Sequence, residues 1–139
     1  MSTPESFDPR LSGRVLAPAG SGLVLAEWTA EGRPDPDRPP IHQAPLHSHG
    51  EDEAFYVLEG ALGVRIGDKD VEVPAGGAAI VPSGAAHTYW NPLPQPTRYL
   101  LVMGTETYAL IQALHTEQVA WGSDAMRELF RAHGATFLG

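Results

Sequence analysis

Two features that are common in proteins are absent from this sequence, and each absence excludes a class of protein. The chain of 139 residues contains no cysteine, so it has neither a disulfide framework nor a thiolate nucleophile. Its stability must come from a hydrophobic core, a bound metal or association with another chain. No apolar run is long enough to span a membrane, and residues 1–10 lack the apolar segment of a signal peptide. We therefore expect a soluble cytoplasmic protein without a membrane partner.

Basic side chains are scarce. The sequence has 9 lysines and arginines against 17 aspartates and glutamates, which gives a formal net charge of −8. Binding to a phosphate backbone needs clustered positive charge, and no helix-turn-helix segment is visible. We expect no nucleic-acid partner and attribute the acidity to solubility.

Turn-forming residues are abundant instead. The 15 glycines and 13 prolines, with 42% hydrophobic residues, favour an all-β fold with many turns. The length fits one domain, and no internal repeat or linker is visible. Short strands separated by turn residues predict a sandwich or barrel between about residues 22 and 103. We expect strands at about 22–29, 42–49, 53–59, 61–67, 70–73, 77–81, 86–91 and 98–103.

The two ends of the chain differ from this middle part. Residues 1–12 are polar and contain proline, and we expect an arm that is disordered or packs on a neighbour. In the last third the apolar residues change to helical spacing, which predicts two short helices at about 106–114 and 123–133. Ser123 is a suitable N-cap for the second helix. We expect the apolar stripes of these helices to pack on the outside of the barrel or at a dimer interface.

A two-part pattern of metal-ligand residues stands out. His47 and His49 are two residues apart, so they point to the same face of a strand and can bind one ion. Glu53 follows at an even spacing, and His87 can complete the set from a distant strand. Three imidazoles and one carboxylate suit divalent Fe, Mn, Ni, Co or Zn, and the sequence does not choose among these metals.

The alternative is that these histidines are structural or surface residues, since a pair two residues apart is common by chance. The four spaced residues together with two turn signals favour a metal site. The turns are Gly60, which lies between two apolar runs, and Pro82-Ser83-Gly84. The other histidines lack such support: we expect His42 to be solvated, His115 to lie in a loop and His133 to cap a helix end.

These two segments resemble the paired motifs of the cupin superfamily. The resemblance spans roughly residues 45–91, with flanking strands extending it to residue 103. One position departs from the family pattern, because Ile41 stands where the first motif usually opens with glycine. The resemblance implies a single-domain, double-sheet jelly roll with His47, His49, Glu53 and His87 as ligands of one divalent metal ion. It also implies a homodimer formed through the N-terminal strands.

Strand alternation suggests which residues line a substrate pocket. Phe55 and Val57 share the face of Glu53, and Tyr89 and Asn91 share that of His87. They predict an apolar pocket for a small organic substrate that chelates the metal through oxygen, although core packing remains an equal alternative for these side chains. Glu53 is also our predicted catalytic residue, as an acceptor of a substrate proton.

The resemblance is closest to small quercetin dioxygenase-like cupins, so we expect a metal-dependent dioxygenase acting on a small enolic or aromatic substrate. Two alternatives remain open, because cupins are functionally diverse. One is a metal-dependent isomerase or cyclase of the polyketide type, which would turn over without oxygen. The other is a non-catalytic module that binds or senses a small molecule.

Overall fold

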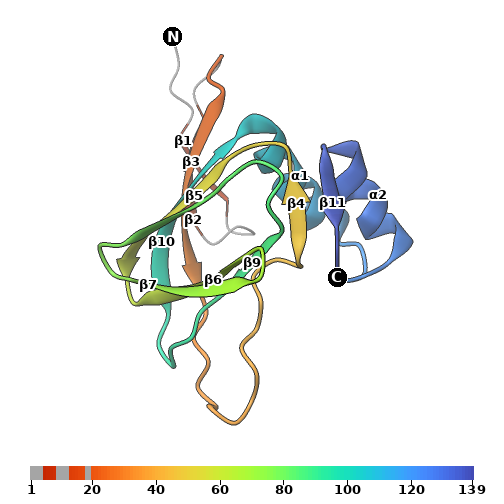
Figure 1. Ribbon diagram of the computed structural model, residues 1–139. Coiled ribbons are helices and arrows are strands. Elements are labelled where there is room, and N and C mark those ends of the chain that lie inside the picture. The colour runs from red at the N-terminus through yellow and green to blue at the C-terminus, as the bar shows by residue number, and fades with distance from the viewer. Residues whose placement is uncertain (1–4, 9–12, 18–19) are drawn as a thin grey trace.

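Two antiparallel β-sheets face each other in this protein, and two helices pack at one side (Figure 1). The computed structural model describes residues 5–8, 13–17 and 20–139. The six-stranded sheet has the order β1 (Glu5–Asp8), β2 (Gly13–Leu16), β3 (Leu23–Ala30), β10 (Thr97–Gly104), β5 (Glu53–Glu59), β8 (Ala78–Val81). The five-stranded sheet has the order β11 (Ala135–Phe137), β4 (His47–His49), β9 (His87–Trp90), β6 (Ala61–Ile66), β7 (Lys69–Pro74). The predicted all-β jelly roll with two helices is confirmed.

The main core lies between the two sheets. Alternate residues of β3 and β10 are buried, as expected for strands with one face toward a core and the other toward solvent. The core consists of aliphatic side chains around an aromatic group, and it includes Val24, Phe55, Val57, Leu62, Val64, Val81, Tyr89, Tyr99 and Leu101. This packing fixes which side chains of each strand point inward.

Glycines end two of the strands in the predicted way. Gly60, between β5 and β6, has a φ of +87°, and Gly84, between β8 and β9, has a φ of +84°. Side chains rarely tolerate this left-handed backbone. At Gly60 a Cβ would also overlap the hydroxyl group of Thr97. Both predicted turns are confirmed.

The helices, α1 (Thr105–Glu117) and α2 (Asp124–Ala132), form a second apolar cluster with β11. Leu110, Met126, Phe130, Ala135 and Phe137 are its buried members. Ser123 caps α2 as predicted, since its hydroxyl oxygen accepts a hydrogen bond from the Met126 amide at 3.2 Å. Among the described residues, no helix is long and apolar enough to cross a membrane.

Three expectations about element boundaries need correction. Within the expected arm at 1–12, Glu5–Asp8 forms β1 and pairs with β2, whereas the rest of that arm lies outside the described residues. The strand expected at 42–49 is only His47–His49. Strand β11 was not predicted, because three residues after a helix carry too little periodicity to indicate a strand; it forms by pairing with β4.

Candidate metal centre and adjoining cavity

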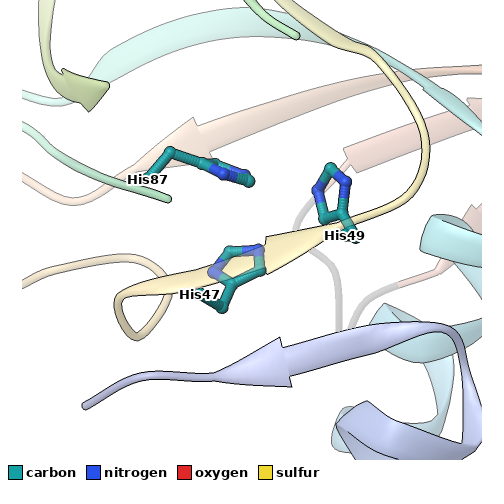
Figure 2. Close-up of side chains that lie close together, drawn as sticks. All are labelled: His47, His49 and His87. Carbon is teal, nitrogen blue, oxygen red and sulfur yellow. The ribbon is translucent and has the colours of Figure 1, made fainter. Parts of the chain in front are cut away.

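Three histidines from two neighbouring strands meet inside the barrel. His47 and His49 are both on β4, and His87 on β9 lies directly opposite His47 in the register. The ring centroid of His87 is 4.3 Å from that of His47 and 4.7 Å from that of His49. One ring nitrogen from each residue lies within 4.8 Å of the others. Figure 2 shows the three rings turned toward a shared space, an arrangement that could hold a metal ion.

The backbone orients all three rings in the same way. Each Nδ1 is within hydrogen-bond distance of the carbonyl oxygen two residues away: Pro45 at 2.6 Å, Glu51 at 2.9 Å and Ala85 at 2.9 Å for His47, His49 and His87 respectively. A carbonyl can only accept, so Nδ1 carries the proton when the ring is neutral. The lone pair is then on Nε2, and a hydrogen bond of this kind is the usual support of a metal-binding imidazole.

The Nε2 atoms provide the test of whether a cation fits. Those of His49 and His87 are buried, and no described group meets them in good hydrogen-bond geometry; their neighbour is the carboxylate of Glu53, itself an acceptor when ionised. Burying a polar atom without a partner is unfavourable. A divalent cation between the rings would satisfy these lone pairs, so the residues present fit a metal ion.

Glu53, at the start of β5, places its carboxylate beside two of these rings. Its oxygens lie 3.5 Å from His49 Nε2 and 3.3 Å from His87 Nε2. Burial by itself raises the pKa of this carboxyl group, but the two imidazoles outweigh burial and lower it to about 2. Glu53 is therefore an anion at neutral pH, beside a group of nitrogen donors.

The pKa values of two of the histidines shift in opposite directions, because burial dominates at His47 and Glu53 dominates at His49. Burial, reinforced by His87, lowers the pKa of His47 to about 4. Burial also acts to lower the pKa of His49, but Glu53 outweighs it and the net direction is upward. His47 is thus a neutral donor at pH 7, as metal binding requires.

A cavity of about 340 Å³ adjoins this group, and His47 and Glu53 reach its surface. The barrel contributes mainly apolar and aromatic side chains to its wall, including Trp28, Tyr89, Tyr99 and Leu101. No lysine or arginine is among the described residues that line it. A pocket of this size and character suits a small, largely apolar organic molecule.

The helices form the other side of this cavity. Leu110, Ile111 and Leu114 of α1 line it, as do Met126 and Phe130 of α2. The helices pack on one side of the barrel, as expected (Figure 1), but the expectation did not include a cavity between their apolar residues and the barrel. His115 also lines the cavity and lies on α1, so its predicted place in a loop is wrong.

The predicted pocket residues lie in different places. Tyr89 lines the cavity, whereas Phe55, Val57 and Asn91 are not among its lining residues. Phe55 and Val57 are fully buried in the main core, and the Phe55 ring packs against Tyr89 with centroids 4.7 Å apart. The side chain of Asn91 forms hydrogen bonds to the carbonyl groups of Ala30, Glu31 and Gln95, so it holds loops together. Alternation gave the faces of these residues correctly but not the position of the cavity.

Comparisons with known proteins identify the domain type. Residues 38–103 match the sequence model of the family described as "Cupin domain". That stretch contains both parts of the metal-ligand pattern. No curated protein matches the sequence.

Solved structures share the fold at low sequence identity. The Cnp3 cupin domain of Schizosaccharomyces pombe is 15% identical, with a TM-score of 0.55 over 72% of this chain and 64% of that one. The protein TT1209 of Thermus thermophilus is 24% identical, with a TM-score of 0.52 over 71% and 88% of the two chains. A cupin-superfamily sugar phosphate isomerase of Silicibacter pomeroyi is 22% identical, with a TM-score of 0.52 over 72% and 68%. At these identities the likeness establishes the fold alone.

Proposed function

Because this chain belongs to the cupin superfamily, we propose that His47, His49 and His87, together with Glu53, hold one divalent transition metal ion. The observation that carries this proposal is the pair of buried Nε2 atoms of His49 and His87, which no described residue meets in good hydrogen-bond geometry. An anionic carboxylate beside them balances part of the cation's charge. Fe, Mn, Ni, Co and Zn all suit these donors.

The function that we propose is that of a metal-dependent dioxygenase acting on a small enolic or aromatic substrate. The ion would supply a Lewis acid with open coordination positions for oxygen donors. The protein supplies the shape: apolar walls from the barrel and both helices line a cavity that would accept a small substrate. Of the four predicted ligands, only His47 and Glu53 line the cavity. A bound ion would therefore attract an oxygen donor of the substrate to that end of the cavity.

Glu53 has a second proposed role, as the acceptor of a substrate proton. Its carboxylate lines the cavity, which puts a proton acceptor beside the position where an enol would bind. A Glu53→Gln variant that kept its metal and turned over at the full rate would contradict this role.

An isomerase or cyclase that uses the same ion to polarise a carbonyl group remains the second candidate; one structural neighbour is named as a sugar phosphate isomerase. The cavity does not favour a phosphorylated substrate, however, since no lysine or arginine among the described residues lines it. An isomerase or cyclase of this type would act on an uncharged carbonyl compound. It would turn over at the same rate with and without oxygen.

Two measurements test the proposed function. Elemental analysis of protein purified without added metal should find about one divalent transition metal ion per chain, and a His87→Ala variant should lose it. Oxygen consumption is then screened against 1,3-diketones and flavonols. Uptake that depends on both metal and substrate supports the dioxygenase, whereas anaerobic turnover supports the isomerase. Binding of these compounds without turnover would point to the non-catalytic module.

A further inference from the structure

One short turn connects the candidate metal centre to the helical wall of the cavity. It consists of Gly50, Glu51 and Asp52, between β4 and β5. Within it the backbone carbonyl of Glu51 accepts a hydrogen bond from His49 Nδ1 at 2.9 Å. The carboxylate of the same residue accepts two hydrogen bonds from Thr107 in the first turn of α1, from the amide at 2.8 Å and from the hydroxyl group at 2.7 Å.

Helix α1 depends on this carboxylate for its N-terminal cap. Its own N-cap residue, Gly104, makes no side-chain cap hydrogen bond. A Cβ at Gly104 would overlap the Glu51 carboxylate, so glycine is what allows the acid to approach. The first amides of a helix need acceptors, and a negative charge is favourable there. Glu51 thus provides from 56 residues away the cap that a neighbouring serine or aspartate usually provides.

The turn is also fixed on its other side. The Asp52 carboxylate accepts a hydrogen bond from the Ser83 amide at 2.8 Å, and the carbonyl group of His49 accepts one from the Gly84 amide at 2.8 Å. Ser83 and Gly84 belong to the turn that leads into β9 and His87. Hydrogen bonds therefore tie the Gly50–Asp52 turn to both ligand strands.

We propose that Glu51 is a positioning residue that couples metal binding at His49 to the seating of α1 against the cavity. This inference rests on the proposed metal centre. Metal on Nε2 fixes the His49 ring and makes its Nδ1–H a stronger donor to the Glu51 carbonyl. The turn then holds its carboxylate on Thr107, and α1 presents Leu110 and Ile111 to the substrate. Because coupling is reciprocal, a well-seated helix tightens metal binding by the same factor.

The test uses Zn(II) as the probe and measures two quantities on the same full-length protein. Hydrogen exchange of the Thr107 amide, followed by NMR, reports the cap directly. Zn(II) affinity is measured by competition with a chelator. In the wild-type protein, Zn(II) should slow exchange at Thr107 by at least about fivefold, the lower end of typical coupling between sites.

Three variants separate positioning from simple charge. Glu51→Ala removes the cap but keeps the carbonyl bonded to His49, so Zn(II) affinity should fall by the same factor and the metal-dependent protection of Thr107 should vanish. Glu51→Gln removes the charge but keeps an acceptor for Thr107, and should restore part of both effects. Thr107→Val leaves every charge in place and removes one donor, and should still weaken Zn(II) binding. The matched control is Glu106→Ala, which removes a charge from the same turn of α1 at a residue beside Gly134. This variant should keep the Zn(II) affinity and the metal-dependent protection of Thr107.

The outcomes distinguish this inference from the proposed function. If the wild-type protein binds no Zn(II), the metal centre fails and the coupling fails with it. If Zn(II) binds but exchange at Thr107 is unchanged, the coupling alone is overturned. Equal losses in Glu51→Ala, Glu51→Gln and Glu106→Ala would reduce the effect to long-range charge and also overturn it.

Discussion

The hydroxyl groups of Tyr89 and Tyr99 form a hydrogen bond in the interior of the barrel, with their oxygens 2.8 Å apart. Both side chains line the cavity, and only 7% and 2% of their surfaces are exposed. Burial raises the pKa of both hydroxyl groups, so each keeps its proton at all ordinary pH values. Among the described residues, each hydroxyl group has the other as its hydrogen-bond partner.

Removing one of these hydroxyl groups should be unfavourable because the other loses its partner. We expect Tyr99→Phe to lower the free energy of unfolding by about 1–3 kcal/mol, the range for a buried polar group left unpaired. The double variant with Tyr89→Phe should be less destabilised than the sum of the two single variants. Denaturant unfolding of all four proteins measures this difference. Additive effects would show that water satisfies each hydroxyl group separately.

Variants of Asn91 test whether this residue stabilises the fold or binds a ligand. Besides its three donated bonds, its Oδ1 accepts hydrogen bonds from the Leu93 amide at 2.9 Å and from the Thr97 hydroxyl at 3.1 Å. Replacing it with alanine leaves several buried groups unpaired, and we expect a loss of at least about 3 kcal/mol in unfolding free energy. Asn91→Asp keeps the acceptor oxygen but turns a second oxygen toward the three carbonyl groups, and should be destabilised at least as much as Asn91→Ala.

Zn(II) affinity, measured under folding conditions, should be unchanged in both variants. A selective loss of metal or substrate binding in a stably folded Asn91→Asp protein would instead show that Asn91 has a role in binding.

One part of the ligand group, the pair on β4, was predictable from the sequence by a local rule. Residues two apart on a strand share a face, which predicted that His47 and His49 lie together. The glycine before His87 predicted a turn there, and Gly84 has a positive φ. Even spacing does not explain Glu53, because a turn separates β4 from β5 and the two strands lie in different sheets; tertiary packing brings its carboxylate to the rings. That Glu53 and His87 complete the group was implied by the resemblance to cupins.

The cavity wall was not predictable in this way. Apolar spacing showed that α1 and α2 bury one face, but not which surface covers that face, since Phe130 meets His47 only through tertiary packing. Glu51 was missed for a related reason: its partner Thr107 is distant in sequence, and a capping acid is usually sought next to the helix. Nonlocal hydrogen bonds carry no periodic signal.

Phe130 is the central side chain of that wall. It is 1% exposed, and its ring lies edge-on to His47 with centroids 5.5 Å apart. Phe130→Ala should cost about 3–5 kcal/mol of stability through the cavity it leaves. Phe130→Leu should recover most of this loss. Thermal unfolding of both variants, with Zn(II) removed by a chelator, separates packing from metal effects; equal destabilisation by alanine and leucine would contradict a packing role.

A homodimer through the N-terminal strands remains a prediction, and the outer face of β5 and β8, at the other end of the six-stranded sheet, offers a second surface for one. Tyr56 on β5 and Ile80 on β8 are 42% and 67% exposed although both are large and apolar. Light scattering should give twice the chain mass of 14.9 kDa. Ile80→Lys should shift the protein toward the monomer if this face is buried between copies. A wild-type monomer at micromolar concentration would contradict the prediction.

Metal binding should stabilise the fold, because the ligands come from separate strands and converge only in the folded chain. At a free Zn(II) concentration of 100 times the dissociation constant, mass action predicts a gain of about 2.7 kcal/mol. The measurement is thermal unfolding with added Zn(II) or with a chelator. His87→Ala should abolish the difference between the two conditions. The matched control is His133→Ala, since His133 lies at the end of α2 with its Nδ1 2.8 Å from the Leu129 carbonyl oxygen, and that variant should keep the full metal-dependent gain.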